Sequence, residues 1–350
     1  MSEFIAFDSH KRYTWMERMN PVTEKVVCRR IEHAPGAIRE ALQGAARGTP
    51  VAIGATANWY WIVGEVEQAG LEPQLVHPRK AKLMMGLTNK TDRLDAHGMN
   101  RLQQNRTLPT VWIPPGTLRD LRELTRTRVA LVGQRTRLKN RLLAVLAKYG
   151  LRVQASDAFG RRAREQWKPC TEQLPEQTRW VVERLLGVVD HLGEQVREIE
   201  KRLDQLVEQT AEMGWLMSLP GVGVILAATI ALEIGEVSRF GSPEQFASYA
   251  GTTPRVHASG GRVRYGPLRV DVNHYLKWAF AEAANSVAVN HLRRPDWYVS
   301  QLYRRVRQRK GHAKAVGAVM HHLAVSAYQV LRRQEIYREP VPQRVCTSGS

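Results

Sequence analysis

Short apolar runs alternate with amphipathic stretches along the first hundred residues. Residues 51–53 (Val-Ala-Ile) form an apolar run of strand length, whereas residues 58–69 have the longer pattern of a helix. The same patterns predict strands at 4–7, 12–16, 25–31, 51–53 and 74–77, and helices at 35–46, 58–69 and 91–104. Two hairpin-linked strands after the first, followed by strand–helix units, predict a mixed sheet with helices packed on it. The first third of the chain is therefore expected to be an α/β domain.

The pattern becomes helical after a linker at residues 109–116, which contains two prolines and a glycine at 114–116. Beyond the linker, apolar residues recur at helical spacings and basic residues crowd the positions between them. Residues 153–175 are polar and are predicted to be irregular. Apolar residues then alternate spacings of three and four, at Val182, Leu185, Val189, Leu192, Val196, Ile199, Leu203 and Leu206. This heptad seam predicts a coiled coil, which packs either within the chain or between chains as a dimer contact.

The last third of the chain is predicted to be mainly α and to begin with a helix-hairpin-helix element. Gly221 and Gly223 flank a valine just before the helical run 224–234. Backbone N–H groups in such a turn can hold a DNA phosphate, although an ordinary helix–helix turn reads the same way. Further helices are expected at 272–290, 297–309 and 313–333. The patterns together predict domains at 1–109, 110–210 and 211–338, followed by a disordered tail at 339–350.

The charge balance points to a polyanionic partner. The 350 residues include 52 Lys and Arg against 33 Asp and Glu, a net charge of +19. Nucleic acid is the leading candidate, and basic helix faces are expected to contact it. A membrane is the weaker alternative, because no apolar run approaches the roughly 20 residues of a spanning helix and no signal peptide is evident. Cys28, Cys170 and Cys346 are widely separated and show no CxxC pairing, so a reducing cytoplasm is expected.

Two acidic residues open the helix predicted at 91–104. Asp92 and Asp95 are three residues apart, so their side chains leave one helix face with Cβ atoms roughly 5–6 Å apart. Helix capping alone is one explanation. Asp8 adds a third acid at the end of the first strand, an edge where α/β folds tend to place ligands. Three such carboxylates predict a site for Mg²⁺ or Mn²⁺, and the neighbouring Lys90 predicts a phosphate-bearing ligand.

A basic, glycine-rich segment at residues 251–269 carries a second group of candidate residues. Its arginines can form forked hydrogen bonds with phosphate oxygens, and they are Arg255, Arg262, Arg264 and Arg269. Ser259 lies in the middle of the segment, directly before two glycines. By composition alone, a serine in this setting indicates turn chemistry rather than a nucleophile.

Several separated motifs resemble a known family. They occur in order as Phe-Ile-Ala-Phe-Asp at 4–8, Asn-Trp-Tyr-Trp at 58–61, Asn-Lys-Thr-Asp-Arg-Leu-Asp at 89–95, Leu-Pro-Gly-Val-Gly at 219–223, Tyr-Ala-Gly-Thr-Thr-Pro at 249–254 and Ser-Gly at 259–260. This series resembles the DEDD-type transposases of bacterial insertion sequences, the insertion-sequence-110 family, which includes Piv-type DNA invertases. The resemblance implies an RNase H-like (RuvC-like) N-terminal domain, a coiled coil and a C-terminal transposase domain.

The resemblance also implies roles for individual residues. Asp8, Asp92 and Asp95 would be metal ligands, and Ser259 would attack DNA as the nucleophile of serine recombinases does. A structured guide RNA would choose the DNA. One position departs from the family, because the glutamate expected after the strand at 51–53 is replaced by Gly54. Either this chain is an impaired transposase, or water or another acid completes the metal shell.

Three functions remain open from the sequence. The first is an RNA-guided DNA recombinase that uses Ser259 and a divalent metal. The second is a nucleic-acid-binding remnant of such an enzyme, and the third is a metal-dependent junction nuclease that uses the acids alone. Recombination between two duplexes implies a dimer, or a tetramer on DNA, located in the bacterial cytoplasm with the nucleoid.

Overall fold

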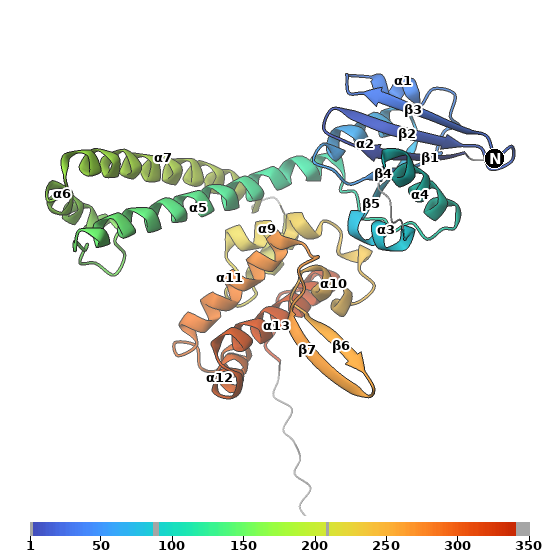
Figure 1. The fold of residues 1–350 in the computed structure, drawn as a ribbon. Coiled ribbons are helices and arrows are strands. Elements are labelled where there is room, and N and C mark those ends of the chain that lie inside the picture. The colour runs from blue at the N-terminus through green and yellow to red at the C-terminus, as the bar shows by residue number, and fades with distance from the viewer. Residues whose placement is uncertain (1–2, 87–90, 208–209, 341–350) are drawn as a thin grey trace, which may run out of the picture. The chain divides into compact units, whose positions relative to one another are not determined.

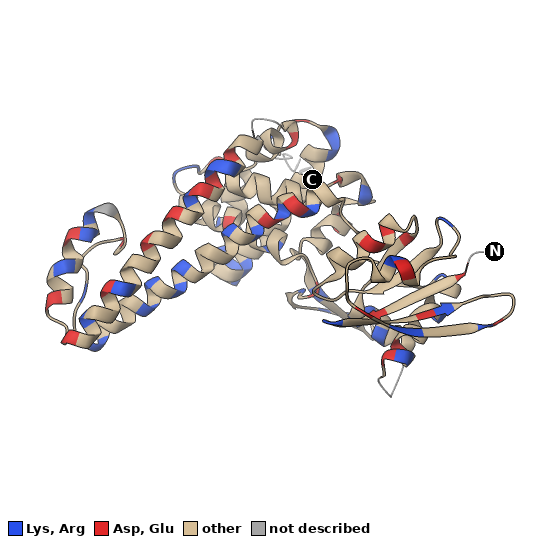
Figure 2. Cartoon of the chain, turned by 90° about the horizontal axis from the view of Figure 1, so that it is seen from above, with Lys and Arg blue, Asp and Glu red and all other residues tan. Residues whose placement is uncertain are grey.

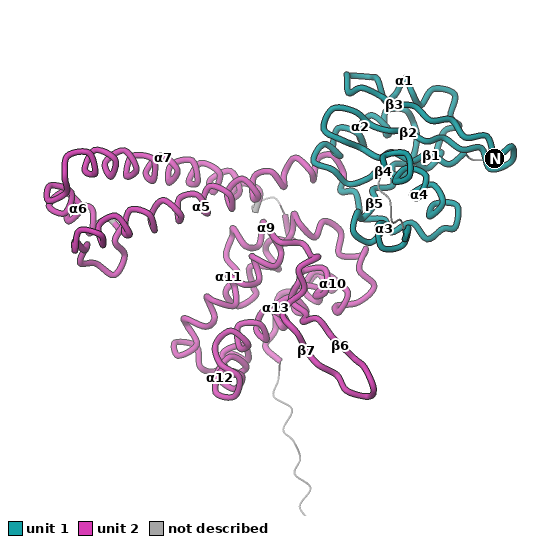
Figure 3. The backbone as a smooth tube through the Cα atoms, in the orientation of Figure 1, with its two compact units in different colours: residues 1–114 teal, residues 115–350 magenta. Residues whose placement is uncertain are grey.

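The structure is a computed structural model that describes residues 3–86, 91–207 and 210–340. It divides into two compact units, residues 1–114 and residues 115–350 (Figure 3). Of the tail predicted to be disordered, only Glu339 and Pro340 lie within the described residues. No helix of the described segments is both long and apolar enough to cross a membrane.

A five-stranded mixed sheet forms the centre of the first unit (Figure 1). The strands are β1 (Phe4–Ser9), β2 (Tyr13–Met19), β3 (Val26–Glu32), β4 (Pro50–Gly54) and β5 (Glu72–Val76), and they lie in the order β3-β2-β1-β4-β5. The first three strands pair antiparallel, whereas β4 joins β1 and β5 joins β4 in parallel. The five predicted strands and the mixed sheet are confirmed, and the topology is consistent with an RNase H-like domain.

Alternation along β1 and β4 sends side chains to two different layers of helices. Phe7 and Ile53 pack with α1 (Ala37–Ala41) and α2 (Trp59–Gln68) on one face. Ala6 and Ala52 pack with α3 (Pro78–Met85) and α4 (Asp92–Gln104) on the other face. Because strand side chains alternate, residue 8 points to the same face as Ala6, toward α4.

The helices of this unit agree with the sequence patterns in part. The predicted helices at 58–69 and 91–104 are confirmed. The helix predicted at 35–46 is much shorter than expected, because α1 contains only the five residues Ala37–Ala41. Helix α3 was not predicted. It begins at Pro78, whose fixed backbone suits a first helical turn, and the ring of His77 accepts a hydrogen bond from the N–H of Lys80.

A long helical hairpin opens the second unit, made of α5 (Gly116–Lys148) and α7 (Glu176–Val207) lying side by side (Figure 1). The heptad residues Val182 and Val189 pack with Leu142 of α5, and Leu203 packs near Leu118. The predicted seam therefore lies within the chain. The prediction of an irregular segment at 153–175 was wrong in part, because this segment contains α6 (Arg164–Glu172), whose Trp167 is buried against both long helices.

The remainder of the second unit is mainly helical, as predicted. Its helices are α8 (Ala211–Met217), α9 (Val224–Ile234), α10 (Pro243–Tyr249), α11 (His274–Asn290), α12 (Tyr298–Lys310) and α13 (His312–Arg333). Phe246 and Phe280 are fully buried at the centre of the core that these helices share. The basic segment between α10 and α11 forms a two-stranded hairpin of β6 (Pro254–Ser259) and β7 (Arg262–Leu268), which the sequence patterns did not predict.

A buried carboxylate joins α5 to the helical core. Glu233 of α9 is 0% exposed, and it accepts hydrogen bonds from Arg126 Nε at 2.7 Å and Arg126 Nη2 at 3.0 Å. Asn273, which caps α11, donates to the other side of the same carboxylate at 2.8 Å. Arg122 donates to the backbone carbonyls of Leu232 and Glu233. Charge pairing at this point ties the helical hairpin to the body of the second unit.

Candidate metal site and nucleophile

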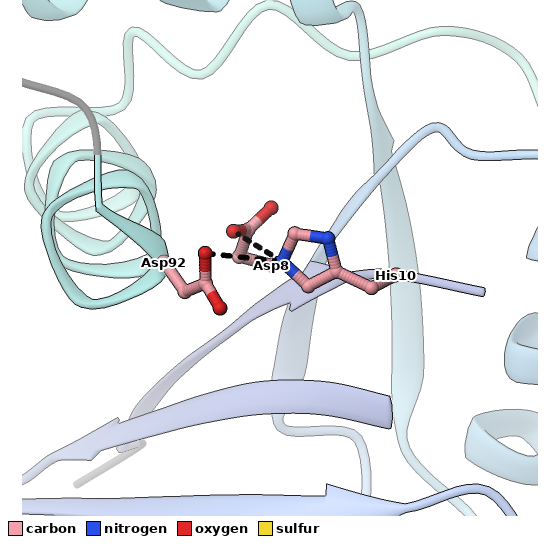
Figure 4. A group of neighbouring side chains, drawn as sticks. All are labelled: Asp8, His10 and Asp92. Carbon is pink, nitrogen blue, oxygen red and sulfur yellow. Dashed lines mark ion pairs between the residues drawn. The ribbon is translucent and has the colours of Figure 1, made fainter. Parts of the chain in front are cut away.

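Asp8 and Asp92 meet where the end of β1 faces the start of α4 (Figure 4). The imidazole of His10 joins them, with its Nε2 3.2 Å from Asp8 Oδ2 and 3.2 Å from Asp92 Oδ1. The hydroxyl of Tyr13 donates to Asp92 Oδ2 at 2.8 Å. Strands β1 and β2, the turn between them and helix α4 therefore bring these four side chains together across more than 80 residues of sequence.

Local contacts fix the beginning of α4 in this place. The side chain of Thr91 caps the helix by accepting a hydrogen bond from the N–H of Leu94 at 3.2 Å. Farther along, Asn100 is fully buried and donates to the buried carboxylate of Glu17 on β2 at 3.0 Å. Because this contact is buried, α4 is held firmly against the sheet, and Asp92 is held facing β1.

The electrostatics of the site favour a bound cation. Burial raises the pKa of the Asp8 carboxyl, and the charges of Asp95 and Asp92 raise it further, while His10 opposes the rise. The hydrogen bond to Asp92 likewise raises the pKa of the Tyr13 hydroxyl. A raised carboxyl pKa means that the ionised form is destabilised, here mainly by burial, and a divalent cation would stabilise that form.

The donor set fits a divalent metal. One ligand atom from each of Asp8, His10 and Asp92 lies within 4.8 Å of the other two. Two carboxylates and one imidazole suit a hard or borderline cation, such as Mg²⁺ or Mn²⁺. His10 was missed from the sequence, and its only signal there is its place two residues after Asp8. Asp95 lies close enough to act on the charge of Asp8, so all three predicted acids belong to one neighbourhood.

Gly54 ends β4 directly beside the site. Phe7 pairs with Ile53 in the parallel register, so the next pair along the two strands is Asp8 and Gly54. Residue 54 therefore faces the same layer as Asp8. A Cβ atom built on Gly54 would lie 3.5 Å from the backbone oxygen of Phe7, an ordinary contact. A side chain at position 54 would therefore begin without a steric clash.

Ser259 lies at the tip of the hairpin in the second unit. It pairs with Arg262, and His257 pairs with Arg264, so these four side chains share one face of the hairpin. They line a hollow of about 440 Å³. Gly260 and Gly261 both have positive φ angles, which the tight turn requires. The hairpin thus presents a hydroxyl on the same face as an imidazole and two guanidinium groups, and His257 is a neighbour that the sequence did not identify.

The other predicted nucleic-acid contacts lie in different settings. Arg255 is exposed on the hairpin, whereas Arg269 lies at its base and donates to the hydroxyl of Ser248 at 2.6 Å. Gly221 has φ +78°, and a Cβ there would lie 2.4 Å from the carbonyl oxygen of Ala283. Its lack of a side chain is therefore required by packing against α11. Gly223 caps α9, and Lys90 lies outside the described residues.

Comparisons with known proteins place the chain among transposases. Residues 5–150 match the DEDD transposase model of the IS110 type, and residues 213–304 match the model of the transposase IS116/IS110/IS902 family. A probable family 20 transposase of Pseudomonas aeruginosa is 24% identical, over 82% of this chain and 85% of its own length. The transposase of insertion sequence IS1111A from Coxiella burnetii is also 24% identical, over 82% of this chain and 78% of its own.

A DNA invertase is a more distant relative. The pilin gene-inverting protein of Moraxella lacunata is 27% identical over 41% of this chain and 46% of its own length. The first family match covers the sheet with the acidic cluster and continues through α5 of the second unit, whereas the second match lies on the helical core. The chain therefore belongs to the IS116/IS110/IS902 family of transposases and carries the DEDD domain of that family at its N-terminal end.

Proposed function

We propose that this protein is an insertion-sequence recombinase that cuts and rejoins DNA through a phosphoserine intermediate at Ser259. Membership of a transposase family supports DNA as the substrate. The observation that carries the proposal is the hairpin face on which Ser259 lies opposite Arg262 and next to His257 and Arg264. A hydroxyl between guanidinium groups is positioned to meet a phosphodiester, because arginine forks match the geometry of phosphate oxygens.

The residues of the hairpin supply the parts of a phosphoryl transfer. The Oγ of Ser259 gives up its proton and bonds to phosphorus, while the bond from phosphorus to a deoxyribose oxygen breaks. The released oxygen takes up a proton, and the imidazole of His257 is placed to carry protons in both directions. The two arginines balance the charge on the phosphate. Attack by a deoxyribose hydroxyl on the phosphoserine reverses these steps and joins strands without ATP.

The acidic cluster has a separate role in this proposal. Asp8, Asp92 and Asp95, together with His10, would hold Mg²⁺ or Mn²⁺ in the first unit. The ion, when bound, neutralises phosphate charge. The residues of the chain hold its ligands in place through β1, the Thr91 cap and the contact of Asn100 with Glu17. With Gly54 in place of the family glutamate, we propose that this copy holds the metal weakly and recombines DNA slowly.

A guide RNA and a homo-oligomer complete the proposal. The net charge is +19, and Lys and Arg occur along both long helices as well as in the core, which supports contact with a polyanion such as RNA or DNA (Figure 2). The heptad seam is occupied within the chain, so it gives no support to a dimer. A dimer or tetramer is instead supported by the need to hold two duplexes at once. A DNA substrate places the protein with the bacterial nucleoid.

Trapping of the covalent intermediate tests the proposal. Wild-type protein and Gly54→Glu are incubated with nicked DNA ends of the element, Mn²⁺ and the RNA encoded beside the gene. We expect a protein–DNA adduct that survives denaturation, with the linkage mapped to Ser259 by mass spectrometry. Ser259→Ala should lose the adduct and retain DNA binding, whereas Ser242→Ala, a helix cap, serves as the matched control.

The same experiment separates the alternative functions. A junction nuclease would retain cleavage in Ser259→Ala and lose it in Asp92→Asn. A binding remnant would form no adduct even after Gly54→Glu, while still binding DNA. Either pattern would contradict the recombinase mechanism.

A further inference from the structure

A pair of neighbouring hollows lies beside the turn between α8 and α9, in the second unit. The first has a volume of about 300 Å³, and Arg293, Arg294 and Trp297 line it together with the turn at Gly221. The second, of about 550 Å³, is lined by residues 217–223 and by the chain after α13. Gly221, Ser286 and Trp297 line both hollows, so the two lie next to each other and share a wall. Volumes in this range suit ligands of small-molecule size.

The walls of the first hollow combine the groups that recognise a nucleotide. Trp297 is half-buried, and the guanidinium of Arg294 lies 5.4 Å from the centre of its ring. Arg293 lies beside it and approaches the side-chain oxygen of Asn290 at 3.5 Å. An indole gives a flat surface for stacking, guanidinium groups bind phosphate, and a side-chain amide both donates and accepts hydrogen bonds.

Charge distinguishes the two ends of the cavity. The residues that line the first hollow, all of them described, include two arginines and no acid. The second hollow contains the carboxylate of Glu339, which accepts a hydrogen bond from the backbone N–H of Tyr298 at 2.8 Å. A phosphate is attracted to the first end and repelled by the second. The shared wall at Trp297 lies between them, where an uncharged base can stack.

We propose that this cavity binds one unpaired deoxynucleotide of the DNA substrate, with the phosphate at Arg293 and Arg294 and the base stacked on Trp297. The proposal rests on DNA being the substrate, as proposed above, and names a contact of that substrate outside the hairpin of Ser259. A base paired within a duplex exposes only its edges, so contact between the base and the indole requires the base to leave the stack. The structure thus assigns to this surface the recognition of distorted or single-stranded DNA.

A duplex with a single unpaired 2-aminopurine tests this assignment, and a fully paired duplex of the same sequence is the reference. Anisotropy reports affinity for each DNA, and the fluorescence of 2-aminopurine reports its environment. Because stacking contributes about 1–3 kcal/mol per base, Trp297→Leu should weaken binding of the bulged duplex roughly tenfold and leave the paired duplex unchanged. Trp297→Phe should retain most of the preference. Trp180→Leu is the matched control, since Trp180 is 60% exposed on α7.

Arg294→Ala provides a test that leaves the indole in place. Arg294 is exposed, so its replacement is expected to fold, and thermal melting verifies each variant. This variant should weaken binding of the bulged duplex and lower the dependence of that binding on salt.

Three outcomes would overturn the assignment. In the first, Trp297→Leu and wild type prefer the bulged duplex over the paired duplex to the same extent. In the second, a preference that depends on Trp297 is found with a bulged RNA but not with the bulged DNA. If wild-type protein binds neither DNA, the nucleic-acid function fails as a whole. A loss confined to the bulged duplex supports the cavity even if no phosphoserine is ever trapped.

Discussion

Replacing Gly54 by glutamate should add a fourth acid to the proposed metal site. The position ends β4, beside Asp8 and on the same face of the sheet. A Cβ there meets only the backbone oxygen of Phe7, at 3.5 Å, so the backbone does not have to move. A glycine within a strand costs about 0.5–1 kcal/mol relative to alanine, and a side chain at this position recovers part of that free energy.

The spacing of the strands sets how much the new carboxylate destabilises the metal-free protein. Neighbouring strands lie about 4.8 Å apart, so a new carboxylate would stand about 5 Å from Asp8. At an effective dielectric constant of 20, two unit charges at that distance repel by roughly 3 kcal/mol. After the gain in backbone stability, metal-free Gly54→Glu should be less stable than wild type by about 2 kcal/mol. For a unit of this size, that difference lowers Tm by roughly 8 °C.

A divalent cation should reverse this loss. The fourth acid adds a ligand, and we expect the affinity for Mn²⁺ to rise at least tenfold, since even indirect contacts to ligands change metal affinity 10- to 100-fold. Thermal melting with EDTA and with Mn²⁺ measures the first effect, and calorimetry measures the second. Recombination on a two-plasmid reporter should rise by orders of magnitude.

Gly54→Gln is the matched control, because it has the same shape without the charge. It should show neither the loss of stability in EDTA nor the gain in metal affinity. Equal Mn²⁺ affinity in the Glu and Gln variants would refute the assignment of position 54 to the metal shell. Unchanged recombination in Gly54→Glu would refute the view that Gly54 impairs the enzyme.

Four further variants test the electrostatics of the fold. Burial raises the pKa of Asp8, so its ionised form destabilises the metal-free fold. Asp8→Asn should therefore raise Tm at pH 7 in EDTA. This gain in Tm should vanish as the pH falls below 3.8, the ordinary pKa of an aspartate side chain. Glu233→Gln removes the buried negative charge that Arg126 binds, so it should cost about 3–5 kcal/mol and lower Tm by roughly 6–20 °C. Glu200→Gln, which removes a part-exposed ion pair, should cost under about 1 kcal/mol. Burial, aided by the charge of His321, lowers the pKa of His322 to about 4. The free energy of unfolding should therefore fall by up to about 3 kcal/mol as the pH is lowered from 6.5 to 4, because the unfolded chain takes up a proton on His322 before the folded chain does. His322→Gln should make this fall smaller. Thermal or urea unfolding at each pH checks these expectations, and a fall of the same size in His322→Gln would contradict the last.

The local pattern of apolar and polar residues predicted much of the secondary structure. The runs at 51–53 and 4–7 are apolar because both faces of β1 and β4 are covered by helices, and buried central strands have this pattern. The spacing of Asp92 and Asp95 and the cap at Thr91 are likewise properties of one helical turn. The pattern did not predict a helix within 153–175, because α6 is only nine residues long, is mostly polar and contains Pro169.

The sequence by itself determined the five strands of the first unit, the long helices, the acidic motif and the family, because each depends on residues that are near neighbours along the chain. The tertiary structure decided that His10 and Tyr13 join Asp92, that the heptad seam is filled by α5, and that Ser259 shares a hairpin face with His257. These are contacts between distant residues or between paired strands. Their partners depend on strand register and helix packing, which no local pattern of the sequence encodes.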